Sequence, residues 1–162
     1  MTSSDTFPPD FGVRVAIDGD LIIVEARESA YVFQNTNGSE WDFVTKLETN
    51  EGYDRDKFGM AVALDGNTAI VGAVGNGHGD TAIVGKKSSA YIFSRNGSDW
   101  DVGKRLIPKD APIEYMFGYN VAINEDTAVI VAIGAVYFFT LSGSEWAEDK
   151  MLSVEIPDFA IF

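Results

Sequence analysis

The sequence predicts an all-β fold of three four-stranded antiparallel propeller-type blades, which together form a partial or open β-propeller. Three observations support this prediction. A Phe-Gly pair, an alternating apolar stretch, an aromatic triplet and a tryptophan recur in the same order three times along the chain. β-Branched and aromatic residues dominate these stretches, and no segment shows a helical period. Asp-Gly and Asn-Gly pairs, which favour tight hairpins, separate the stretches.

Each copy is predicted to form four consecutive strands. Apolar residues of the first strand alternate with smaller or polar ones, so they share one face. The second and third strands are apolar at nearly every position, which is typical of strands covered on both faces. The fourth begins at the tryptophan and includes polar residues, as an outer strand does. These strands are expected at 13–18, 21–24, 31–33 and 41–47, then at 60–65, 69–71, 91–93 and 100–106, and finally at 119–123, 128–131, 137–139 and 146–151.

Short turns are predicted between these strands. Asparagine, aspartate and glycine tolerate the positive φ angles that two-residue hairpins require. The turns between the first and second strands are Asp18-Gly19, Asp65-Gly66 and Asn124-Glu125, and those between the third and fourth are Asn37-Gly38, Asn96-Gly97 and Ser142-Gly143.

Composition limits the partners and the chemistry. The net charge is −13, which disfavours nucleic acids because phosphates attract Lys and Arg. No apolar run approaches the roughly 20 residues of a membrane helix, so no membrane insertion is expected. The chain has no Cys and a single histidine, His78, and the sequence predicts a non-enzymatic protein. An enzyme that uses only carboxylates on the propeller rim is the weaker alternative.

The repeated landmarks resemble the FG-GAP repeat family, whose repeats build the propeller of integrin alpha subunits. The second copy carries Phe58-Gly59, Asp65-Gly66, Gly72-Ala73 and the triplet Tyr91-Ile92-Phe93. The resemblance covers residues 11–152. It implies an adhesion-like protein-interaction module and favours an extracellular or cell-surface location. The glycine-alanine element is absent from the first and third copies, which have Glu25-Ala26 and Ala132-Ile133 instead.

No cofactor is predicted. Many members of the family hold calcium in a loop between the first two strands, so calcium is the alternative to consider. Ca²⁺ takes six to eight oxygen ligands, and a two-residue turn such as Asp18-Gly19 supplies too few. The sequence therefore predicts structural turns there.

The domain boundaries follow the repeats. The second copy has an insertion between its second and third strands, and the last residues are either a tail or the start of a next repeat. The predicted segments are a lead-in at 1–10, blades at 11–57, 58–116 and 117–152, an insertion at 75–88, and the end segment at 153–162.

Three blades leave an apolar face uncovered at each end of the stack, because each blade needs neighbours on both sides. A protein partner, further propeller blades or a homodimer would cover these faces. A structural part of a larger or oligomeric propeller, with no ligand of its own, is therefore the main functional alternative.

A candidate partner-binding site lies on one rim of the predicted propeller. The loop between the second and third strands opens on the same rim as the connections between blades. The insertion 75–88 should therefore lie near 48–57 and 107–116, and loops on a rigid β scaffold commonly carry function. The residues predicted to bind a partner are Glu51, Tyr53, Asp54, Asn76, His78, Asp80 and Tyr115.

Overall fold

The computed structural model describes residue 8 and residues 10–26, 29–49, 56–75, 88–109 and 116–153, in which every regular element is a β-strand. The predicted all-β fold of three antiparallel sheets is confirmed. No helix in these ranges is long and apolar enough to cross a membrane. Most of the predicted lead-in 1–10 and end segment 153–162 lies outside the described residues.

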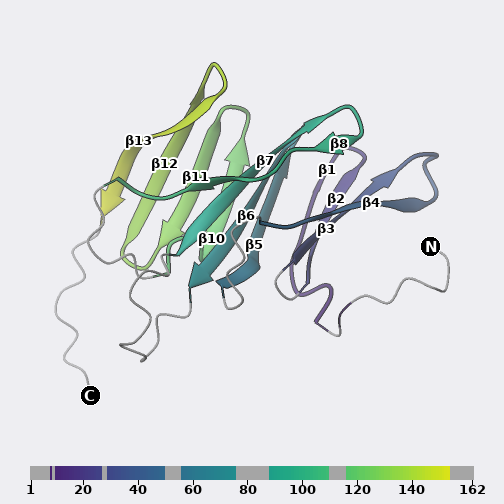
Figure 1. Ribbon diagram of the computed structural model, residues 1–162, viewed down its shortest axis with the longest axis horizontal. Helices are drawn as coiled ribbons and strands as arrows, with labels where there is room; N and C mark the ends of the chain where they lie inside the picture. Colours follow the sequence, from purple (N-terminus) through teal and green to yellow (C-terminus); the bar gives the residue numbers. More distant parts are fainter. Residues whose placement is uncertain are drawn as a thin grey trace.

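The three sheets follow one another along the chain and stand side by side (Figure 1). The four strands of the first and third sheets pair in chain order, whereas the last two strands of the second sheet both pair with its third strand. Sheet 1 contains β1 (Val15–Asp18), β2 (Leu21–Ala26), β3 (Ser29–Asn35) and β4 (Trp41–Leu47). Sheet 2 contains β5 (Asp56–Asp65), β6 (Thr68–Gly75), β7 (Ser89–Asn96), β8 (Asp99–Trp100) and β9 (Lys104–Leu106). Sheet 3 contains β10 (Asn120–Asn124), β11 (Thr127–Ala132), β12 (Ala135–Ser142) and β13 (Glu145–Ser153).

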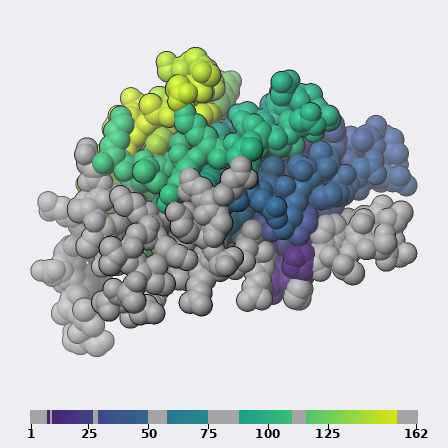
Figure 2. Space-filling view, viewed as in Figure 1, coloured from purple at the N-terminus to yellow at the C-terminus, as the bar shows by residue number. Residues whose placement is uncertain are grey.

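The first strands of the three sheets are neighbours, because β5 lies beside both β1 and β10. The fourth strands lie at the opposite edge of each sheet. This arrangement places the sheets like successive blades around an axis, and it is an open, propeller-like stack. The described surfaces of the three sheets are in direct contact in the space-filling view (Figure 2).

Sheet 2 is buried on both faces because its side chains alternate between two cores. On β6, Val71 packs towards sheet 1 while Ile70 packs towards sheet 3. On β7, Phe93 packs towards sheet 1 and Ile92 packs towards sheet 3. This explains why the central strands are continuously apolar: each face of the pleat has its own neighbouring sheet to cover it.

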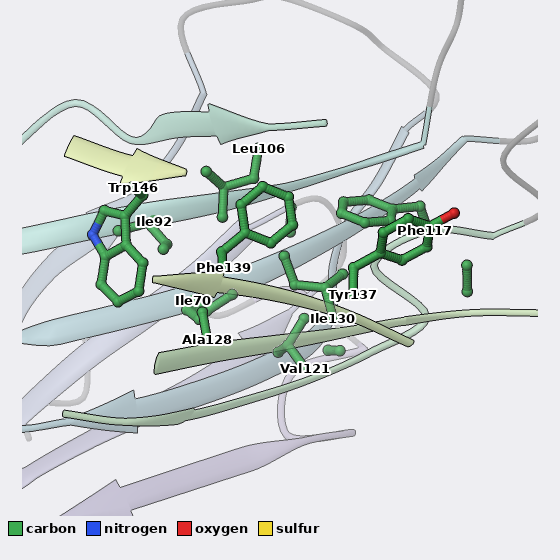
Figure 3. Packing of buried hydrophobic residues seen from close by; sticks show 13 residues of the cluster. Ile70, Ile92, Leu106, Phe117, Val121, Ala128, Ile130, Tyr137, Phe139 and Trp146 are labelled. Atoms are coloured by element: carbon green, nitrogen blue, oxygen red, sulfur yellow. The ribbon is translucent and has the colours of Figure 1, made fainter. Parts of the chain in front are cut away.

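Aromatic rings fill the core between sheets 2 and 3. Phe117 is fully buried and meets Tyr137 and Phe139 edge to face, at centroid distances of 5.2 and 6.2 Å. Leu106 lies over Phe139, and Trp146 closes one end of the cluster beside Ile92 (Figure 3). Edge-to-face pairs add about 0.5–1.5 kcal/mol to the free energy gained from burial, so these three rings of sheet 3 stabilise the core that it shares with sheet 2.

Three local predictions are corrected by the structure. The segment Asn37-Gly38 does not form a two-residue hairpin, because β3 and β4 are joined by residues 36–40. The Asn37 side chain accepts hydrogen bonds from the amides of Ser39 and Glu40, which stabilises this wider loop. The fourth strand of sheet 2 is interrupted at 101–103, and the first strand of sheet 1 begins at Val15 rather than Val13.

The turn between β10 and β11 stores backbone strain that the other sheets avoid. Glu125 has φ +51°, whereas the matching positions are Gly19 at +55° and Gly66 at +54°. An L-residue in the left-handed region is destabilised by about 1–2 kcal/mol relative to the right-handed one, while glycine is not.

Replacing Glu125 with glycine is therefore expected to raise the free energy of unfolding by about 1 kcal/mol, since part of the relieved strain is offset by the more flexible unfolded chain. Urea unfolding would measure it. The matched control is Gly66→Glu, which should destabilise the protein by a similar amount. A Glu125→Gly variant no more stable than the parent would contradict the assignment of strain to this turn.

Candidate functional site

The seven residues predicted to bind a partner lie outside the described residues. These are Glu51, Tyr53, Asp54, Asn76, His78, Asp80 and Tyr115. Their role as a rim site stays a prediction. Within the described ranges, no group of three or more His, Asp or Glu residues is placed to hold a metal ion.

The aspartates of the first turns connect neighbouring sheets. The Asp18 carboxylate accepts a hydrogen bond of 2.7 Å from the amide of Gly66, which belongs to the next sheet. Asp65 accepts in the same way from the amide of Glu125. Hydrogen bonds to a charged group are worth about 1.5–3 kcal/mol, so these side chains hold successive sheets in one register. Sequence reasoning treated them as local turn residues, although the repeated acid at one turn position was the available signal.

The glycines of the second and third Phe-Gly pairs pack against the preceding sheet. Gly59 and Gly118 have φ +96° and +88°. A methyl group on Gly118 would overlap the carbonyl oxygen of Ser89, and one on Gly59 would lie 2.8 Å from that of Ser29. A methyl group on Gly72 would in turn overlap the carbonyl oxygen of Gly118. Between sheets 2 and 3, the Phe117-Gly118 pair and the Gly72-Ala73 element therefore meet at a close approach of the two backbones.

Glu25 occupies the position in sheet 1 that Gly72 has in sheet 2. Its side chain is half-buried, and Oε2 lies 3.7 Å from Nη1 of Arg14 without accepting a hydrogen bond. Desolvation by burial raises the pKa of the Glu25 carboxyl above its usual value, and the positive charge of Arg14 opposes this shift. The negative charge of Asp10 adds to the rise in this pKa. A methyl group on Gly59 would lie 3.1 Å from Cγ of Glu25, so this side chain stands at the contact between sheets 1 and 2.

The face of sheet 1 that is turned away from sheet 2, which we call the head face, is apolar and exposed. Ala16 packs towards sheet 2, so its neighbours Val15 and Ile17 point the other way. Both are 63 % exposed, whereas Val121, at the position of Val15 in sheet 3, is 7 % exposed. The head-face residues are Phe11, Val15, Ile17, Tyr31, Phe33 and Phe43, of which Phe33 is buried.

Aromatic rings on the head face reproduce those of the internal interfaces. Phe11 meets Tyr31 and Phe33 edge to face at 5.6 and 6.0 Å, as Phe58 meets Tyr91 and Phe93. Gly12 has the same φ of +96° as Gly59, yet a methyl group on it would meet nothing within 4 Å. Sheet 1 thus has the backbone angle and the ring contacts that sheet 2 uses to dock on its neighbour, and none of the three described sheets lies in front of this face.

The face of sheet 3 that is turned away from sheet 2, which we call the tail face, is apolar as well. Ile130 and Phe139 pack towards sheet 2, so their neighbours on the strands point the other way. Leu152 is 47 % exposed and is paired with Val136. The tail-face residues are Val129, Val131, Val136, Phe138 and Leu152.

Comparison with protein families agrees with this geometry. Residues 41–93 match the model described as FG-GAP repeat. The chain carries an FG-GAP repeat. The matched segment runs from β4 to β7, so this FG-GAP unit combines the last strand of sheet 1 with three strands of sheet 2. It includes Gly59 and Gly72, which lie at two successive contacts between sheets. No curated protein matches the chain.

Proposed function

We propose that the protein is a non-enzymatic protein-interaction module that binds a protein partner through the head face. The observation that carries the proposal is the exposure of Val15 and Ile17, which are both 63 % exposed. The equivalent side chains of sheets 2 and 3, Val62 and Leu64 and then Val121 and Ile123, pack against the preceding sheet. Contiguous apolar surface of this kind on a folded protein commonly marks an interaction site.

The FG-GAP repeat supports the same proposal, since the propeller-type scaffold suits interaction and adhesion. A partner that covers the head face needs an apolar surface to accept the Phe11 and Val15 side chains. The rim residues predicted from the sequence to bind a partner, including His78, are a separate prediction.

Site-specific photocrosslinking tests the proposal. A photoreactive phenylalanine in place of Val15 is expected to give a covalent adduct with a defined protein in an extract of cells that express the chain. The control carries the same group in place of Val102, which is 62 % exposed but lies between β8 and β9, away from the head face. Mass spectrometry identifies the partner. If position 15 yields no adduct beyond those of position 102, the proposed function is wrong.

A further inference from the structure

We propose that the partner is a second copy of this chain, bound head to tail: the head face of one copy covers the tail face of the other, and two copies close a ring of six sheets. This inference rests on the proposed function and names its partner. It follows from comparing the two outer faces with the two interfaces inside the chain, which show how one sheet receives the next.

The apolar residues on the two outer faces match the two sides of an internal interface. Inside the chain, the side that receives the next sheet carries leucine on the outer strand, at Leu47 and Leu106. Leu152 stands at the same position of the tail face, because it pairs with the residue before Tyr137, as Leu47 and Leu106 pair with the residues before Tyr31 and Tyr91. The opposite side carries a phenylalanine and a tyrosine, which the head face supplies as Phe11 and Tyr31.

The turn hydrogen bonds can continue across the same contact. Asp18 and Asp65 each accept from the amide of the following turn. Asn124 holds this position in sheet 3, and its side-chain oxygen is also an acceptor. The matching donor position in sheet 1 is the amide of Gly19. Head-to-tail docking in the internal register therefore brings Asn124 of one copy to Gly19 of the other.

Charge complementarity points to the same register. Lys104 on sheet 2 pairs with Glu145 on sheet 3. Lys150 has the position of Lys104, because Phe138 pairs with Lys150 as Ile92 pairs with Lys104. Glu40 has the position of Glu145, since each directly precedes the tryptophan of its sheet. Docking the head face on the tail face would thus place Lys150 of one copy opposite Glu40 of the other.

The two outer faces therefore supply the two different sides of an internal interface. A head-to-tail contact must either close as a ring or continue as a filament. Two copies of three sheets give a closed stack in which no apolar face stays exposed. Closure also makes both contacts form together, which raises the affinity without any new contact type.

Light scattering after size exclusion, with two blocked variants, tests this arrangement. The wild-type chain should elute at twice its 17.6 kDa. Val15→Asp blocks the head and Leu152→Asp blocks the tail, so each alone should be monomeric. In a mixture, the Leu152→Asp copy retains an intact head face and the Val15→Asp copy an intact tail face. The two should therefore form a one-to-one heterodimer. Val102→Asp is the matched control and should remain a dimer. Circular dichroism checks that each variant is folded, since all three side chains are exposed within one copy.

Charge reversal provides an independent measurement. Glu40→Lys and Lys150→Glu should each weaken self-association about tenfold, because both contacts of the ring then bring like charges together. The double variant Glu40→Lys/Lys150→Glu should recover most of the wild-type affinity, since each contact regains an opposite pair.

Three results would overturn the proposal. A wild-type chain that stays monomeric at high protein concentration excludes the second copy, whereas an adduct of position 15 with another protein would still uphold the proposed function. A Leu152→Asp variant that dimerises alone would show head-to-head pairing. A ladder of larger species would show that the contact does not close as a ring.

Discussion

Replacing Gly118 with alanine is expected to be among the most destabilising single substitutions in the chain. Its φ of +88° strains any L-residue by about 1–2 kcal/mol. The added methyl group would also overlap the carbonyl oxygen of Ser89, which belongs to the backbone of sheet 2 and cannot rotate away. Overpacking of this kind costs about a further 1–3 kcal/mol. The free energy of unfolding should therefore fall by about 3 kcal/mol or more.

The three Phe-Gly pairs provide matched controls for this measurement. Gly12→Ala has the same backbone strain but no neighbouring atom within 4 Å, so it should lose only about 1–2 kcal/mol. Gly59→Ala should fall between the two, since its methyl group would lie 2.8 Å from the Ser29 carbonyl oxygen. Urea unfolding in a Val15→Asp background keeps a second copy away from Gly12. Equal losses at Gly12 and Gly118 would show that the backbone angle alone, and not the approach of the sheets, requires glycine.

This comparison also shows what the sequence could and could not predict. The strands were predictable because the alternation of residues such as Val62 and Leu64 reports a half-covered face, and the aromatic triplets report a strand between two sheets. The Phe-Gly pair was recognisable as a repeated landmark. The reason why this position requires glycine was not predictable, because Gly118 and Ser89 are far apart in sequence and meet only when the sheets stack.

Local exceptions depended on side-chain contacts that spacing does not reveal. The segment Asn37-Gly38 has a hairpin signature, but Asn37 uses its side chain to hold a five-residue connection at 36–40. The fourth strand of sheet 2 breaks beside Gly103, where a methyl group would lie 2.5 Å from the ring of Phe93. In both places a specific contact, and not the apolar pattern, determines the local backbone.

The candidate site was predictable in part. Counting blades indicated that two apolar faces would be uncovered, and Val15 and Ile17 are indeed exposed on one of them. The sequence did not show that Asp18 links two sheets or that Lys104 pairs with Glu145 across an interface. Both links join residues from different repeats, so they become visible only when the sheets are placed side by side.

Replacing Phe117 with alanine is the second substitution with a large expected effect. Its side chain is fully buried and contacts two aromatic rings of sheet 3 within the core shared with sheet 2. Removing a buried phenylalanine costs about 3–5 kcal/mol, because transfer free energy is lost and a cavity remains. This loss should appear as a lower midpoint in urea unfolding. If replacing a half-buried phenylalanine with alanine lowered the free energy of unfolding by the same amount, burial would not be the cause of the loss at Phe117.

Phe11 is the matched control, since it makes the same edge-to-face contacts in sheet 1 but is only half-buried. Within a single copy, Phe11→Ala should destabilise the protein by less than half as much as Phe117→Ala, because less apolar area is removed from a covered core. The proposed head-to-tail ring would bury Phe11 as well. The loss caused by Phe11→Ala should then be larger in the wild-type background than in the monomeric Val15→Asp background, whereas the loss caused by Phe117→Ala should be similar in both. Equal losses for Phe11→Ala in the two backgrounds would place Phe11 outside the contact between copies.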